Sequence, residues 1–132
     1  MITLDDYFGK WLMHPDATEQ RKANAGLMLK LVNALLLEYP YSVEINPLTK
    51  SRISGATYGG FRPQDCPQGA PTSSHKEGRG IDIYDPHGTL DDWLGDTLLA
   101  QYGLYRESPD STHGWTHLSD RAPPSGRRTF RP

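Results

Sequence analysis

An apolar stripe with helical spacing between Asp16 and Glu38 constrains the fold more than any other feature of this chain. Apolar residues recur there three and four positions apart along the whole segment, which predicts one long helix with a wide buried face. Tyr39-Pro40 should end this helix, because proline disfavours helical geometry in the residue before it. Such a stripe needs a second layer to cover it, so we expect the helix to lie across a sheet.

The rest of the chain alternates short periodic segments with turns, which favours an α+β domain over a helical bundle. The 132 residues include 13 glycines and 11 prolines, and 36% are hydrophobic. This length fits one domain, residues 1–132, that buries a core without disulfides. The expected architecture is a small antiparallel sheet packed against two main helices. Besides the long helix, we predict a helix over 3–13 and a helix from Thr89 to about Gln101. Thr89 would cap the second of these helices, and Asp92 would complete a capping box. Strands are predicted near 41–46, 52–54, 81–84, 104–107, 115–118 and 127–131.

Charge and cysteine content narrow the classes of function. The net charge of −2 does not favour electrostatic binding to nucleic acid. The single Cys66 excludes an intramolecular disulfide and a zinc site built from several thiolates. The first residues lack the basic and apolar pattern of a signal peptide, and no apolar stretch is long enough to span a bilayer. We therefore expect a monomer that is made in the cytoplasm and has no stable membrane association.

The chemistry of the chain is concentrated between Ser73 and Asp82. His75 and Asp82 stand seven residues apart, with two glycines between them that allow a sharp turn. Imidazole nitrogen and carboxylate oxygen together suit zinc, and His117 is the best third ligand elsewhere in the chain. Taken alone, the pair also fits a solvated strand residue beside a loop histidine.

A zinc hydrolase needs more than its metal ligands. A side chain must move the proton of the attacking water, and a donor must stabilise the oxyanion that forms on the scissile carbonyl. Glu107, Asp110 and His113 are the candidate bases in the sequence. Arg62 follows a glycine-rich passage that allows close approach of a substrate, so it is the candidate partner of the oxyanion.

Three blocks of sequence, taken together, resemble the zinc peptidases of the D-Ala-D-Ala carboxypeptidase, VanX-type dipeptidase and phage endolysin group, whose fold is shared with the Hedgehog signalling domain. The blocks occur in that family's order and cover about residues 52–119 of this chain. They are Gly59-Gly60-Phe61-Arg62, Ser73-x-His75-x-x-Gly78-x-Gly80-x-Asp82 and Trp115-x-His117-x-Ser119. Gly80 stands where the family more often has alanine, and we expect this difference to have no steric consequence.

The resemblance implies a role for each matched residue. His75, Asp82 and His117 would hold one Zn²⁺ ion, and Arg62 would steady the substrate carbonyl and the oxyanion. Ser73 would make a hydrogen bond near the metal loop rather than react. Apart from the resemblance, Trp115 stands two residues from His117 and would share its face of a strand, where it either walls the substrate site or packs in the core.

The catalytic carboxylate is where the chain departs from the family. The positions at which the family places it, shortly before the last histidine, are Gly114 and Ser111 here. Glu107 is the preferred base, because Tyr105-Arg106-Glu107-Ser108 resembles a family passage if residues are inserted after it. Asp110 is the alternative.

The resemblance implies a zinc-dependent peptidase that hydrolyses peptide bonds of bacterial peptidoglycan. Such a chain would be a phage or prophage lytic enzyme of the endopeptidase or D-Ala-D-Ala carboxypeptidase type, reaching the cell wall after release from the cytoplasm or as part of a virion. The unusual position of the carboxylate leaves an alternative, a non-catalytic zinc-stabilised phage structural module that binds wall peptides. The basic tail, residues 120–132, is interpreted as a solvated edge strand, with weak attraction to an anionic wall or lipid as the other reading.

Overall fold

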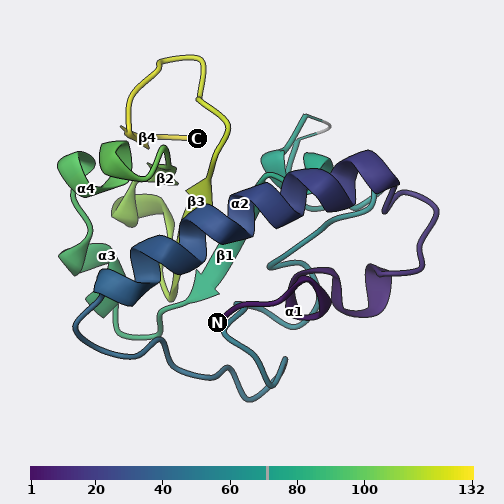
Figure 1. Ribbon diagram of the computed structural model, residues 1–132, viewed down its shortest axis with the longest axis horizontal. Coiled ribbons are helices and arrows are strands. Elements are labelled where there is room, and N and C mark those ends of the chain that lie inside the picture. The colour runs from purple at the N-terminus through teal and green to yellow at the C-terminus, as the bar shows by residue number, and fades with distance from the viewer. Residues whose placement is uncertain (71) are drawn as a thin grey trace.

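The computed structural model describes residues 1–70 and 72–132, and one long helix, α2 (Glu19–Glu38), crosses the molecule (Figure 1). The hydroxyl of Thr18 accepts a hydrogen bond from the Arg21 N–H and so caps the first turn. The predicted start at Asp16 is therefore early, since Asp16 lies before the cap. The end at Glu38, directly before Tyr39-Pro40, is as predicted.

The N-terminal helix is shorter than the sequence pattern indicated. α1 (Leu4–Phe8) begins with a capping box in which Thr3 and Asp6 each bond the other's backbone N–H. Gly9 ends it with a φ of +51°, a left-handed conformation that glycine adopts without strain. A single 3₁₀ turn, η1 (Gly9–Trp11), follows, so the predicted helix over 3–13 is wrong beyond its first half.

The helix predicted from Thr89 to about Gln101 is two short helices, α3 (Thr89–Trp93) and α4 (Asp96–Gln101). Leu94 and Gly95 between them are extended, which breaks the helical hydrogen bonding. The predicted cap is also wrong, because Thr89 makes no capping hydrogen bond. Instead, the buried Asp85 carboxylate accepts hydrogen bonds from the backbone N–H groups at the start of α3, those of Leu90 and Asp91.

Four strands form one sheet in the order β1-β3-β2-β4. They are β1 (Gly80–Tyr84), β2 (Tyr105–Glu107), β3 (Trp115–Ser119) and β4 (Thr129–Phe130). The first three pair antiparallel, as predicted. β4 runs parallel to β2, so the sheet is mixed and the expectation of a purely antiparallel sheet is wrong. The 3₁₀ turn η2 (Ser74–Glu77) precedes β1, and the 3₁₀ turn η3 (Pro109–Ser111) follows β2. The fold class is α+β.

The segment predicted to form the first two strands forms no regular strand, although Ile53 in its second half makes an isolated antiparallel bridge to Ile83 at the edge of β1. Residues 41–46 form no strand, and Asn46 makes only an isolated bridge to Ser51. The Asn46 side chain donates to the carbonyls of Ile53 and Gly55, which folds the chain back on itself. Hydrogen bonds from Ser54 N–H to the Asp82 carbonyl and from Asp82 N–H to the Gly59 carbonyl then hold the glycine-rich passage against β1.

The core lies on one face of the sheet. Ile81, Ile83 and Leu118 are fully buried there, in one apolar cluster with side chains of α2. Side chains alternate along a strand, so Asp82 and His117 point to the other face. No helix among the described residues is long and apolar enough to cross a membrane.

Candidate metal centre

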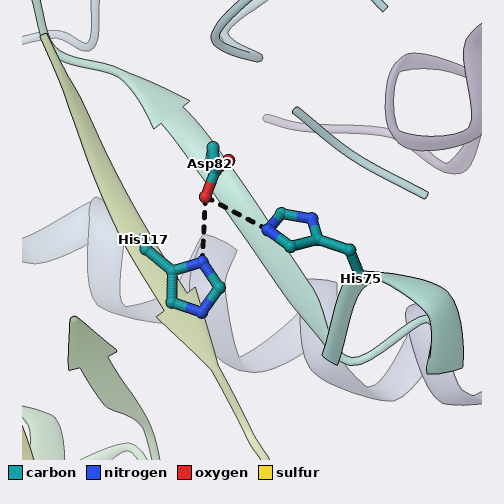
Figure 2. Close-up of side chains that lie close together, drawn as sticks. All are labelled: His75, Asp82 and His117. Carbon is teal, nitrogen blue, oxygen red and sulfur yellow. Dashed lines mark hydrogen bonds and ion pairs between the residues drawn. The ribbon is translucent and has the colours of Figure 1, made fainter. Parts of the chain in front are cut away.

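His75, Asp82 and His117 meet on the sheet face opposite the core (Figure 2). Three different elements supply them, the turn η2 and the strands β1 and β3. Their ligand atoms all lie within 4.8 Å of one another, and all three side chains are buried. Two imidazoles and one carboxylate in this arrangement could hold a metal ion. The structure thus brings together the three residues that the sequence predicted as ligands.

Local backbone chemistry places His75. The Ser73 hydroxyl accepts a hydrogen bond from the His75 N–H, which caps the turn η2. Gly78 ends the turn with a φ of +75°. The chain then enters β1, which carries Asp82. The pattern Ser-x-His-x-x-Gly is therefore the sequence of a capped 3₁₀ turn that aims its histidine at the following strand.

The hydrogen bonds of His75 leave a metal-binding nitrogen facing the other two residues. Its Nδ1 lies 2.8 Å from the Gly60 carbonyl oxygen, which only accepts, so Nδ1 carries the proton. Burial lowers the pKa of His75, although the charge of Asp82 opposes the shift, and the ring is therefore held neutral. Its Nε2 is then an acceptor that lies 3.2 Å from the acceptor oxygen Oδ1 of Asp82. Two acceptors facing each other call for a cation between them, which is the observation that favours a metal ion at this site.

Asp82 is ionised and is held from both sides. Burial by itself would raise its pKa, but the imidazoles of His75 and His117 keep the pKa well below the usual range of an aspartate. Its Oδ1 lies 2.8 Å from Nδ1 of His117. Its Oδ2 accepts a hydrogen bond from Nη2 of Arg62 at 3.2 Å, while Nε of Arg62 donates to the Tyr58 carbonyl. Arg62 thus orients the carboxylate in addition to facing the cleft described below.

The strand registers show which side chains share this face of the sheet. Asp82 of β1 pairs directly with His117 of β3. The β2–β3 register pairs Tyr105 with Ser119 and Arg106 with Leu118, and Glu107 is the next residue of β2. Glu107 in turn pairs with Phe130 of β4. Glu107 shares a face with Tyr105 two residues before it, and the partner of Tyr105, Ser119, shares a face with His117. The preferred base therefore lies on the sheet face that carries the candidate metal ligands.

The electrostatics of Glu107 agree with this placement. Burial raises the pKa of its carboxyl, and the charges of His117, Asp82 and Arg62 all act on it. The alternative base, Asp110, is exposed and forms an ion pair with the exposed Arg131. His113 is exposed in the loop before β3 and is not part of the metal-binding group. Among the three candidate bases, Glu107 is the one that the fold directs to the site.

A cleft of about 390 Å³ opens beside Asp82. The glycine-rich passage 54–59 forms one wall, and Arg62, Gln68 and Trp115 complete the lining. Trp115 comes two residues before His117 on β3, so both side chains lie on the site face of the sheet. The cleft therefore lies directly beside one of the three candidate metal ligands, Asp82.

Two aromatic residues at the site were not singled out by the sequence reasoning. The Phe130 ring stands edge-on to the His117 ring, with 6.2 Å between the ring centres, and covers it from β4. The buried Tyr7 of α1 donates its hydroxyl to the Gly80 carbonyl, which anchors the start of β1. An apolar Phe130 within an arginine-rich tail was the available signal for the first. Tyr7 lies 73 residues from Gly80, and no local pattern reveals such a contact.

A Cβ at Gly80 would force a neighbouring side chain to move, whereas the sequence led us to expect no steric consequence. A Cβ built on Gly80 would collide with the hydroxyl of Ser74 and would lie 3.2 Å from Cε1 of His117. Alanine therefore fits only if Ser74 turns away. The close packing of η2 against β1 and β3 at this point explains the glycine.

Comparisons of the chain with protein-family models, with curated proteins and with solved structures give no match. The resemblance of the three sequence blocks to zinc peptidases therefore stays a prediction.

Proposed function

We propose that this protein is a zinc-dependent peptidase with a Hedgehog-like fold that hydrolyses peptide bonds of bacterial peptidoglycan, as part of a phage or prophage lytic system. One observation carries the proposal: the buried His75, Asp82 and His117 bring their ligand atoms within 4.8 Å of one another, on the sheet face that also carries Glu107. The order and spacing of the three sequence blocks supply the substrate class.

The donor set fits zinc better than a harder cation. Two neutral imidazoles and one carboxylate are typical of catalytic zinc sites, whereas calcium and magnesium take mostly oxygen ligands. When bound, zinc supplies Lewis-acid chemistry that polarises a carbonyl group and makes water more acidic. His75, Asp82 and His117 would hold it, and the Gly60 carbonyl and the Arg62 guanidinium would orient two of these ligands.

Each of the remaining side chains at the site has its own role in the proposed hydrolysis. Glu107 takes the proton of the attacking water as its oxygen bonds to the scissile carbonyl carbon, and then gives this proton to the leaving amine. Burial raises the pKa of Glu107, and a raised pKa suits a group that must both accept and release a proton. Arg62 lines the cleft and is positioned to stabilise the oxyanion. Trp115 lines the same cleft, and Phe130 shields the His117 ring from solvent.

The direct test is digestion of purified bacterial sacculi. We expect the zinc-loaded protein to release new amino termini from them, a chelator to stop the release, and added zinc to restore it. Mass spectrometry of the released peptides would show whether a cross-bridge, a stem peptide or a terminal D-Ala is cut. Stoichiometric zinc with intact sacculi across a range of pH would contradict the peptidase and would favour the non-catalytic wall-binding module.

A further inference from the structure

The outer face of α2 carries a stripe of apolar residues, interrupted by Lys30, that no part of the described chain covers. Ala23, Leu27, Lys30, Ala34 and Leu37 follow one another at spacings of four, three, four and three residues. This is the spacing with which one helix packs along another. Leu27 is 66% exposed and Leu37 is 88% exposed, and Figure 1 shows no element in front of α2. Single exposed leucines are common on protein surfaces, so this stripe gains weight only where it borders a concave apolar surface.

A groove runs along one edge of this stripe. It encloses about 720 Å³ between α2, the N-terminal residues and the segment 41–43, and Lys30, Ala34 and Leu37 line it as well. Asn33 fixes the N-terminal wall, since its side chain donates to the Ile2 carbonyl and accepts from the Ile2 N–H, both at 2.9 Å. The buried Leu29 and Val43 contribute to the lining, and Met1 and the exposed Tyr41 stand at the rim. The groove is therefore formed by contacts within the fold.

The charged residues that line the groove indicate which kind of partner would bind there. Lys30 and Arg52 line it, and no carboxylate does. Neither cation forms an ion pair with any residue in 1–70 or 72–132. The chain as a whole is acidic, with a net charge of −2, so this cationic apolar groove differs from the average surface. A partner with leucine-like side chains and a carboxylate complements it.

A second copy of this chain is a poor occupant. Lys30 is the central residue of the stripe, so a two-fold symmetric pairing of α2 with α2 would set Lys30 against Lys30 of the second copy. Like charges opposed in an apolar contact are destabilising. We propose that the α2 groove, defined by the stripe and the lining residues above, binds an acidic amphipathic helix of a different protein, packed alongside α2 with a carboxylate at Lys30 and Arg52.

Binding of two matched synthetic peptides to the full chain tests this proposal. The first is a fluorescently labelled helix of about 20 residues with leucines at alternating spacings of four and three and glutamates beside its central leucine. The second carries lysines in place of the glutamates. We expect fluorescence anisotropy to show binding of the glutamate peptide and at least about tenfold weaker binding of the lysine peptide. Lys30→Glu should reverse this preference.

Two leucine variants distinguish binding in the groove from non-specific hydrophobic binding. Leu37→Gln should weaken binding of the glutamate peptide by about tenfold or more, with no change in melting temperature, because Leu37 is exposed. Leu48→Gln is the control, since Leu48 is 73% exposed but does not line the groove. Equal binding of both peptides, binding of neither, or no effect of Leu37→Gln would overturn the proposal. So would Leu37-dependent dimerisation in sedimentation, or Leu37-dependent binding to phosphatidylglycerol vesicles in preference to the peptide.

Discussion

Asp82 and His117 are directly opposed across β1 and β3, and Nδ1 of His117 lies 2.8 Å from Oδ1 of Asp82. This relationship depends on strand register, because a slip by one residue would turn every side chain of a strand to the other face. The register is held from the core side, where Ile81, Ile83 and Leu118 are fully buried. The apolar core thus determines the geometry of the candidate metal centre on the opposite face.

Glu107→Gln should separate catalysis from metal binding. The amide keeps the shape of the side chain but cannot take a proton from water, so we expect sacculus cleavage to fall by about 10²- to 10⁴-fold. Zinc content and melting temperature should hardly change, since Glu107 is not among the three grouped ligands. Initial rates of amine release measure cleavage, and elemental analysis of the same sample measures zinc content.

Asp110→Asn is the matched control for this variant. Asp110 is exposed and paired only with the exposed Arg131, so its loss should leave the rate within about twofold. A collapse of activity in Asp110→Asn with full activity in Glu107→Gln would transfer the role of base to Asp110.

Zinc should stabilise the folded protein through the three ligands. A ligand that binds only the native state raises its stability with concentration, by about 2.7 kcal/mol when free zinc is a hundredfold above its dissociation constant. We expect the melting temperature to rise accordingly in the wild type and His117→Ala to lose most of this rise. His113→Ala should keep it, because His113 is exposed and lies outside the metal-binding group. An equal response of the two variants would argue against the site.

The ligands could be predicted from the sequence because most of their geometry is local. Ser73, His75 and Gly78 belong to one capped turn, and Asp82 follows four residues later on the next strand. The placement of Glu107 beside His117 could not be derived in the same way. It depends on the register between β2 and β3 and on the chain between them, which no short-range pattern specifies.

The errors in the predicted elements have physical causes too. The stripe from Thr89 onward reads as one helix, but Leu94 and Gly95 are extended and Leu94 is buried in the core, so tertiary packing overrides the local pattern. Residues 41–46 alternate like a strand, but among the described residues their only β-bridge is the one from Asn46 to Ser51. β4 lies at the edge of the sheet, as predicted for residues 127–131, but it pairs in parallel with β2 and carries Phe130 to the His117 ring.

Gly80→Ala should destabilise the protein although it adds one methyl group. The new Cβ would meet the Ser74 hydroxyl and press on the His117 ring, and overpacking of this kind costs about 1–3 kcal/mol. Gly26→Ala is the matched control, since Gly26 lies within α2 and a Cβ there meets nothing within 4 Å. That change should stabilise the protein by about 0.5–1 kcal/mol. Urea unfolding measures both free energies, and an unchanged value for Gly80→Ala would show that Ser74 moves aside without cost.

Asp91 should make the stability of the protein fall as the pH rises from about 4 to about 6. Burial raises the pKa of Asp91 from 3.8 to about 6, with the nearby Asp85 adding to the shift and the Thr112 hydroxyl and Arg106 opposing it. Its Oδ1 is buried and has no hydrogen-bond partner among the described residues. In this pH window the unfolded chain releases the Asp91 proton while the folded chain retains it, so the free energy of unfolding falls as the pH rises. Below the window both states are protonated, and above it the loss is complete.

Asp91→Asn isolates this effect, because the amide stays neutral at every pH. Relative to this variant, the wild-type free energy of unfolding should fall by roughly 1–3 kcal/mol between pH 4 and pH 7. Urea titrations in the presence of a chelator measure it without a contribution from metal release. Asp92→Asn, at the exposed neighbouring position, should show no such pH-dependent difference. A wild-type advantage over Asp91→Asn that grows with pH would mean that Arg106, whose Nη1 lies 3.7 Å from Oδ1 of Asp91, outweighs burial and keeps this carboxylate ionised.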